Sequence, residues 1–239
     1  TTITTTKCKN NEMKYRDISQ RITSAFSAAI ILLFGAALFT KCASTMTPTG
    51  GPKDTIPPVI IFMEPNNFTT NIDTLHPPKI YIEFDEYVQI KDQQKEFFPS
   101  PMMKKTPTVT TSGKGIRITI LDTLEENQTY ALNFGNSIVD NNEGNRLSGL
   151  RYVFSTGGDI DSLVMSGYTE DSKKLDSMGR TFIYFFEADS IEAPDKYDST
   201  MFKYQPSKIA RSATNGIFIA QNLKPVDYRV YAFFDSNDN

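Results

Sequence analysis

The sequence predicts an all-β protein, with two tandem β-sandwich domains after a lipoprotein signal peptide and a flexible tether. Three observations lead to this prediction. Several short segments alternate apolar and polar residues, which is typical of half-buried strands. Clusters of Gly, Pro and Asn separate these segments, as turns between strands do. Aromatic residues make up 12% of the chain and long helix-forming runs are few, a composition that favours strands.

The first sandwich is predicted over residues 58–157. Its clearest strand is the alternating segment 79–88, which places apolar residues on one face and Tyr81, Glu83 and Asp85 on the other. Further strands are expected over 115–120, 129–134 and 151–156. The side chains expected in the core come from several of these strands: Ile80, Ile82, Phe84, Ile118 and Phe134.

The second sandwich is predicted over residues 161–239, after a boundary at Gly157-Gly158-Asp159. Asn215-Gly216 predicts a tight turn, because both residues tolerate a left-handed backbone. The expected strands are 163–168, 181–186, 217–220 and 228–234. We interpret the chain as a fragment that continues beyond Asn239.

The N-terminal part carries the three features of an export signal. Residues 1–12 are interpreted as read-through upstream of a start at Met13, and residues 13–41 as the signal peptide. A cationic start is followed by the apolar stretch 22–39 and by a processing site. The cationic residues are Lys14, Arg16 and Arg21.

Cys42 follows this stretch at the position of a lipobox cysteine, so we expect it to be the lipidated mature N-terminus. Lys41 departs from the small residue that usually precedes such a cysteine. The alternative is an uncleaved membrane anchor, because an apolar stretch of this length could just span a bilayer. Residues 42–57 are small, polar and turn-forming, which predicts a flexible tether between membrane and fold.

Charge and cysteine content argue against a nucleic-acid-binding protein and against a fold held together by disulfides. The net charge is −3, without the clustered Lys and Arg that nucleic-acid binding requires. Only Cys8 and Cys42 are present, and Cys8 precedes the predicted start, so the exported chain contains no second cysteine for a disulfide.

Residues 42–156 resemble Bacteroidota lipoproteins with an N-terminal SbsA-type Ig-like domain. Residues 161–239 are similar to a transthyretin-like, carboxypeptidase-regulatory-type β-sandwich. These resemblances imply architecture but no chemistry. The segments that carry the first are 48–54, Pro57-Pro58, 84–88, 127–130, 140–145 and 154–157, and those that carry the second are Ser166-Gly167, 215–218 and 222–225 leading into Tyr228.

No catalytic constellation is recognised, so we expect no enzymatic activity in these residues. His76 is the only histidine and lacks an identifiable nucleophile or orienting partner. The acidic group Glu83, Asp85 and Glu86 is interpreted as a solvated strand face, with an acid–base or cation site as the alternative.

Two Asp- and Asn-rich segments have the oxygen ligands that calcium prefers. Residues 140–144 are interpreted as a turn. In residues 235–239, Asp235, Asn237 and Asn239 have the spacing that opens a calcium loop. A plain loop is the favoured interpretation of both, and no other cofactor is expected.

Asp is followed by Ser or Thr more often than the Ser and Thr content of the chain would give by chance. The pattern resembles the O-glycosylation sequon of the Bacteroidota periplasm. Turns rich in Asp-Ser and Asp-Thr are the alternative explanation. The candidate acceptors are Thr55, Thr74, Thr123, Ser162, Ser177, Ser190 and Thr200.

We therefore expect a lipid-anchored envelope protein whose modules act as spacer or interaction surface, with a protein partner in the envelope. The alternatives are a surface glycan-binding protein, for which Tyr184-Phe185-Phe186 is suggestive, and the accessory region of an enzyme whose catalytic domain lies beyond Asn239. Surface-exposed lipoproteins of Bacteroidota typically carry acidic residues directly after the lipidated cysteine. Here the first carboxylate is Asp54, so an outer-membrane location facing the periplasm is expected.

Overall fold

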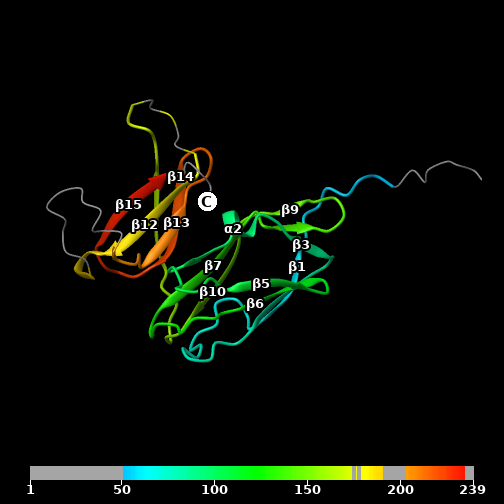
Figure 1. Cartoon of the computed structure of the whole chain (residues 1–239), viewed down its shortest axis with the longest axis horizontal. Coiled ribbons are helices and arrows are strands. Elements are labelled where there is room, and N and C mark those ends of the chain that lie inside the picture. Colours follow the sequence, from blue (N-terminus) through cyan, green and yellow to red (C-terminus); the bar gives the residue numbers. More distant parts are fainter. Residues whose placement is uncertain (1–50, 174–175, 177–178, 191–202, 235–239) are drawn as a thin grey trace, which may run out of the picture. The chain divides into compact units, whose positions relative to one another are not determined.

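A computed structural model describes residues 51–173, 176, 179–190 and 203–234. Contacts group residues 53–239 into one unit, whose described strands are drawn in Figure 1. The described residues are almost entirely strands and turns, and the prediction of an all-β fold is confirmed. The helices in this part of the chain are the short α2 (Gln93–Glu96) and the 3-10 helix η1 (Ala188–Ser190). No helix within it is long and apolar enough to cross a membrane.

The first sandwich contains three antiparallel sheets. One has the order β1 (Ile60–Glu64), β2 (Ile80–Phe84), β6 (Gly115–Thr119), β5 (Thr108–Ser112). The second has the order β10 (Leu150–Ser155), β7 (Thr129–Gly135), β4 (Phe98–Ser100). The third has the order β3 (Val88–Ile90), β8 (Ile138–Asp140), β9 (Arg146–Leu147).

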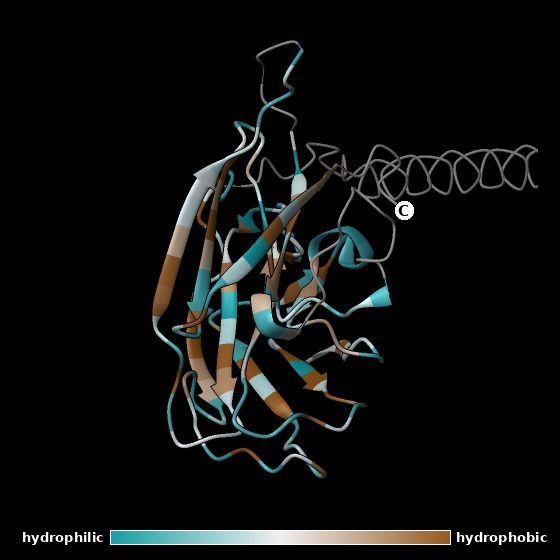
Figure 2. Cartoon of the chain, turned by 90° about the vertical axis from the view of Figure 1, so that its left-hand side faces the viewer, coloured by the Kyte–Doolittle hydropathy of each residue, from teal (hydrophilic) through white to brown (hydrophobic). Residues whose placement is uncertain are grey.

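One hydrophobic core joins these sheets. Hydrophobic and hydrophilic bands alternate along several strands (Figure 2), and in β2 the residues between Tyr81 and Glu83 and on either side of them are buried. Every side chain predicted for this core is at most 2% exposed: Ile80, Ile82, Phe84, Ile118 and Phe134. Tyr130 and Phe154 stack beside them with ring centroids 5.3 Å apart.

The predicted strand 79–88 is wrong as a single element. The ladder of β2 ends at Phe84, a bend follows at Asp85 and Glu86, and β3 then pairs with β8 in a different sheet. The Oδ1 atom of Asp85 accepts a hydrogen bond from the amide of Val59 at 2.8 Å, which fixes the bend. Because Asp85 lies outside the strand, it does not share a strand face with Glu83.

The second region contains two sheets that face each other. Strands β11 (Leu163–Tyr168) and β14 (Ile217–Leu223) form one, and β13 (Lys208–Arg211), β12 (Thr181–Glu187) and β15 (Tyr228–Phe234) form the other. Ile183 and Phe185 of β12 pack against Ala220 and Leu223 of β14 in a small core. Four of these five strands were predicted from their sequence, and β13 was not.

The predicted turn at Asn215-Gly216 is present. The amide of Gly216 donates to the carbonyl of Ala213 at 2.9 Å, and Gly216 has a φ of +83°. A Cβ at this position would lie 2.4 Å from the carbonyl oxygen of Thr169, so only glycine fits. The strands on either side of this turn, β13 and β14, belong to different sheets.

Candidate functional site

Several predicted sites lie outside the described residues: Cys42, the calcium ligands Asp235, Asn237 and Asn239, and the glycosylation candidates Ser177 and Thr200. The signal peptide lies there too, and so does the side chain of Ser190. These sites stay predictions.

The described glycosylation candidates lie at or near the surface. Thr55, Thr123 and Ser162 are exposed and Thr74 is half-buried. At two of these sequons the preceding aspartate closes a turn: Asp54 accepts from the amide of Ile56 at 2.9 Å, and Asp73 from the amide of Leu75 at 2.8 Å. Turn formation therefore accounts for the residue pattern at these two positions without a modification.

Asp140 organises the turn predicted over residues 140–144. Its Oδ1 atom accepts from the amides of Asn142, Glu143 and Gly144 at 2.7, 2.6 and 3.1 Å, and its Oδ2 atom from the amide of Asn145 at 2.8 Å. Burial would raise the pKa of Asp140, but these amides outweigh it and lower the pKa to about 2. Both carboxylate oxygens are thus used by the turn.

The other predicted polar groups are His76 and the acidic residues Glu83, Asp85 and Glu86. His76 lies at the surface, with Nδ1 4.0 Å from Oδ2 of Asp73. Burial, followed by the charges of neighbouring carboxylates, raises the pKa of Glu86. The residues that the structure describes contain no group of three or more His, Cys, Asp or Glu side chains that could hold a metal ion.

A buried ion pair connects the two sandwiches. Glu96, in α2 of the first, is 3% exposed. Its Oε2 atom accepts from Arg211 of β13 at 2.6 Å, and its Oε1 atom from Arg180 at 2.5 Å. Burial would raise the pKa of Glu96, but the amide of Asn136 and the two guanidinium groups hold it below the usual range.

Gly135 leaves the space that this ion pair occupies. It ends β7 with a φ of +54°, and a Cβ there would lie 2.3 Å from Oε2 of Glu96 and 2.7 Å from an Arg211 nitrogen. The Arg211 guanidinium also lies over the ring of Phe98, 5.3 Å from its centroid, and donates to the carbonyl of Lys95. Backbone conformation and side chains of the first sandwich thus shape a socket for Arg211.

A second buried cation lies in the same interface. Lys208 of β13 is 3% exposed and its ammonium donates to the carbonyl of Thr129 in β7. Burial, the largest influence, lowers the pKa of Lys208 to about 8. Nearby, the Ile209 amide donates to Ser100 Oγ at 2.8 Å, and Arg151 donates to Asn222 Oδ1 at 2.8 Å. Charged and polar contacts therefore cross the interface along β4, β7 and β10.

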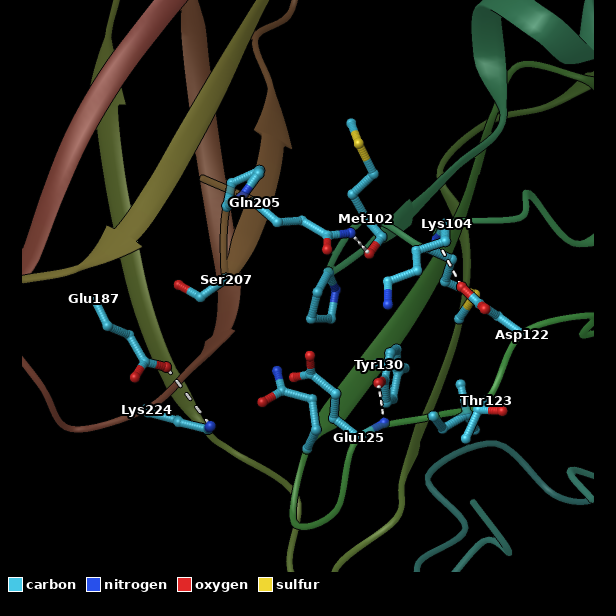
Figure 3. Close-up of a pocket in the computed structure, with 15 residues that line it drawn as sticks. Met102, Lys104, Asp122, Thr123, Glu125, Tyr130, Glu187, Gln205, Ser207 and Lys224 are labelled. Atoms are coloured by element: carbon cyan, nitrogen blue, oxygen red, sulfur yellow. Dashed lines mark hydrogen bonds and ion pairs between the residues drawn. The ribbon is translucent and has the colours of Figure 1, made fainter. Parts of the chain in front are cut away.

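A polar cleft of about 290 Å³ opens beside this interface (Figure 3). The side chains of Glu125, Tyr130, Glu187, Lys224 and Gln205 line it from both sandwiches.

Most of the polar groups in the cleft already have protein partners. Lys224 lies 3.6 Å from Glu187, the Lys104 amide donates to Asp122 at 2.6 Å, and the Glu125 amide donates to the Tyr130 hydroxyl at 2.8 Å. Burial raises the pKa of that hydroxyl. Its lining of carboxylates, lysines, hydroxyl groups and amides offers hydrogen bonds to a polar ligand.

A second groove, of about 420 Å³, carries aromatic side chains. Tyr184, Phe186 and Tyr204 line it together with Lys203 and Gln205. Phe185, which lies between two of these residues in the sequence, points into the core and is 0% exposed. The aromatic run noted in the sequence therefore divides between core and groove, as strand alternation predicts.

The comparisons with known proteins bear on the first sandwich. Residues 54–156 match the family model described as a bacterial Ig-like domain. The antiparallel sheets and shared core of the first sandwich are consistent with an Ig-like β-sandwich over these residues. Domains of this kind occur in bacterial surface proteins. No curated protein matches the chain.

Two solved structures are similar at 13% identity and a TM-score of 0.28. One is an L,D-transpeptidase from Mycobacterium smegmatis, where the match covers 67% of this chain and 78% of that one. The other is the N-terminal part of the bacterial S-layer protein SbsC, with 75% and 44% covered. Likeness at this level supports no conclusion about this chain.

Proposed function

We propose that this chain is a non-catalytic, lipid-anchored cell-envelope protein whose two sandwiches act together as a spacer and interaction module. The Ig-like sandwich supports an envelope or surface role. The observation that carries the proposal is the buried ion pair between Glu96 and Arg211, reinforced by Arg180. Such contacts suit a module that holds its two halves in one orientation.

The physical argument rests on the cost of burying charges. Moving a carboxylate and a guanidinium out of water is unfavourable unless their geometry and hydrogen bonding are good, so a buried pair favours one arrangement over its competitors. Here three partners satisfy the carboxylate of Glu96, and a rotation between the sandwiches would separate all but the Asn136 amide from it. A fixed orientation lets the module set a distance between the membrane and a partner.

The test is whether the sandwiches tumble as one body. Backbone ¹⁵N relaxation of the full chain should give one rotational correlation time for both. Arg211→Gln should give two different values, because it removes the charge facing Glu96. Arg146→Gln is the matched control, since it removes an exposed arginine whose pair with Asp92, at 3.7 Å, stays within the first sandwich. Separate tumbling in the unaltered protein would overturn the proposal.

The membrane attachment rests on Cys42. A cysteine after a cationic and apolar segment is the arrangement that lipidation requires, and more than one acyl chain gives stable anchoring. The fold of the described residues begins a short distance beyond it: Asn145 donates to the carbonyls of Asp54 and Ile56 at 3.1 and 3.2 Å. Residues 54–56, at the end of the predicted tether 42–57, are thus attached to the first sandwich. We extend the proposal to an SbsA-type first domain and a transthyretin-like second domain.

Glycan binding is a second candidate function, favoured by the aromatic groove. Sugar rings have apolar C–H faces that stack on aromatic rings, and their hydroxyl groups require polar partners nearby. The groove combines both features in Tyr184, Tyr204 and Gln205. A glycan array should show binding that Tyr204→Ala abolishes. Tyr87→Ala, which alters an exposed tyrosine of the first sandwich, is the control. An array without any bound glycan would rule this function out.

A further inference from the structure

Strand β11 (Leu163–Tyr168) has a free edge. It pairs with β14 on one side, and among the described residues no strand pairs with it on the other. Its side chains are unusually exposed for an apolar strand: Leu163 is 50% exposed, Val164 59% and Tyr168 52%. An apolar edge of this kind is a template for another strand.

The register shows which backbone groups point toward this edge. The amide of Thr169 donates to the carbonyl of Gly216 at 2.9 Å, so Thr169 directs its backbone polar groups toward β14. In an antiparallel ladder this direction alternates from residue to residue. Gly167 and Met165 therefore also face β14, whereas Val164, Ser166 and Tyr168 direct their N–H and C=O groups outward.

The strand lacks the charged residues and prolines that often prevent edge pairing. Natural edges carry Lys, Pro or an inward-pointing charge. Residues 163–168 contain no charged residue and no proline. Among the described residues the facing sheet ends in β13 and β15, and both contain charged residues: Lys208 and Arg211 in β13 and Arg229 in β15. The outer face beside β11 is uncharged too, with Ile217 50% and Ile219 57% exposed on β14.

We propose that β11 pairs with β11 of a second copy of this chain, antiparallel and centred on Ser166. A two-fold axis perpendicular to the sheet keeps the outer face of both copies on the same side. Outer-face residues must then lie opposite one another, which places Ser166 opposite Ser166 and Val164 opposite Tyr168 of the other copy. These are the residues whose backbone groups point outward, so the three amides of each copy donate to the three carbonyls of the other.

The side chains fit the same register. Val164 and Tyr168 of opposite copies become cross-strand neighbours on the outer face, beside Ile217 and Ile219. Pairs of aromatic and β-branched residues are favourable in this arrangement. Ser166 is small enough to face its own copy across the axis. The result is a four-stranded sheet with an uncharged outer face, and this self-complementarity favours a second copy over an unrelated strand.

The interface is short, so the dimer should form in a concentration-dependent way. Stable interfaces bury about 800 Å² on each partner, and one edge strand supplies less. Sedimentation equilibrium of the full chain should show a monomer–dimer equilibrium. Ser166→Pro removes the outward N–H and leaves the bonds to β14 in place, and Ser166→Lys places two like charges opposite each other. Both should weaken dimerisation at least tenfold, whereas Ser166→Ala should not.

Hydrogen exchange tests the register without any substitution. The amides of Val164, Ser166 and Tyr168 should become protected only at high protein concentration, whereas those of Met165 and Gly167 should be protected throughout. A chain that stays monomeric, or association that all three Ser166 variants retain equally, would overturn the proposal. Exchange of the three outward amides that is independent of concentration would overturn it as well.

Discussion

Glu96 and Arg211 are 115 residues apart in the sequence and form a direct ion pair, with Oε2 of Glu96 2.6 Å from the guanidinium. Their side chains are 5% and 12% exposed, so the pair is screened from water by both sandwiches. Electrostatic attraction is stronger in such a site than at the surface, and so is the penalty for leaving one partner alone. This pair is therefore a sensitive place to test how the two sandwiches depend on one another.

Replacing Glu96 by Gln should destabilise the protein by about 3–5 kcal/mol, because it leaves the buried Arg211 guanidinium without a counter-charge. Urea unfolding monitored by circular dichroism measures this loss. Asp92→Asn is the control, since it removes one partner of the exposed pair with Arg146 and should cost less than about 1 kcal/mol. Similar losses of unfolding free energy for the two variants would show that the buried pair stabilises the protein no more than the exposed pair does.

Lys208 should make stability rise with pH. In the folded protein its pKa is lowered to about 8, whereas in the unfolded chain it keeps the ordinary value of 10.5. Between these values the unfolded chain binds the proton that the folded chain has released, so raising the pH favours folding.

Between pH 8 and pH 10, the free energy of unfolding of the unaltered protein should rise by about 2 kcal/mol relative to that of Lys208→Met. Buried tyrosines act in the opposite direction near the upper end of this range, because burial raises the pKa of Tyr130 and Tyr152. The comparison at each pH cancels their effect. A constant difference between the two proteins across this range would contradict the prediction.

Phe84 tests the core that the sequence predicts. It is 0% exposed at the end of β2, so Phe84→Ala removes a fully buried ring and leaves a cavity. The expected loss is about 3–5 kcal/mol, measured by thermal or urea unfolding. Phe62→Ala, in the neighbouring strand β1, removes a ring that is 47% exposed and should cost much less. A loss below about 1 kcal/mol for Phe84→Ala would mean that this residue does not anchor the core.

The prediction of strands from sequence depended on alternation, and its success followed the strength of that pattern. Ile80, Ile82 and Phe84 alternate with polar residues and were assigned correctly. Strand β1 was missed because its burial does not alternate, with Ile61 and Phe62 both exposed. Strand β4 is short and contains Pro99, and a proline argues against a strand in any prediction made from local sequence.

The interface could not be predicted in the same way. Glu96, Lys208 and Arg211 are ordinary charged residues in the sequence, and their role depends on pairing between distant segments. The one local signal is the order of residues in β13. Lys208 and Arg211 flank the apolar pair Ile209-Ala210, so strand alternation places one charge on each face of the strand. Such a strand must bury a cation somewhere, but its sequence does not identify the partner.

Cys42→Ala tests the lipid anchor. Removing the only thiol at the predicted processing site should abolish metabolic labelling with palmitate and leave an unprocessed precursor of higher mass. Cys8→Ala should leave both properties unchanged, because Cys8 precedes the predicted start at Met13. Labelling that persists in the Cys42→Ala protein would refute the assignment and favour an uncleaved membrane anchor.

The last prediction concerns the membrane face. We expect the protein to face the periplasm, because residues 43–47 contain no carboxylate that could act as a surface-export signal. The first carboxylate, Asp54, follows Cys42 by twelve residues, and the backbone carbonyl of Asp54 accepts a hydrogen bond from Asn145 of the first sandwich. A factor that reads a negative cluster in the residues directly after Cys42 would find no carboxylate in residues 43–47. Protease added to intact cells should therefore leave the protein whole, and protease added after lysis should degrade it.

Replacing Ser44, Thr45 and Met46 by Asp should move the protein to the surface and make it sensitive to protease in intact cells. Degradation of the unaltered protein without lysis would show that it already faces outward.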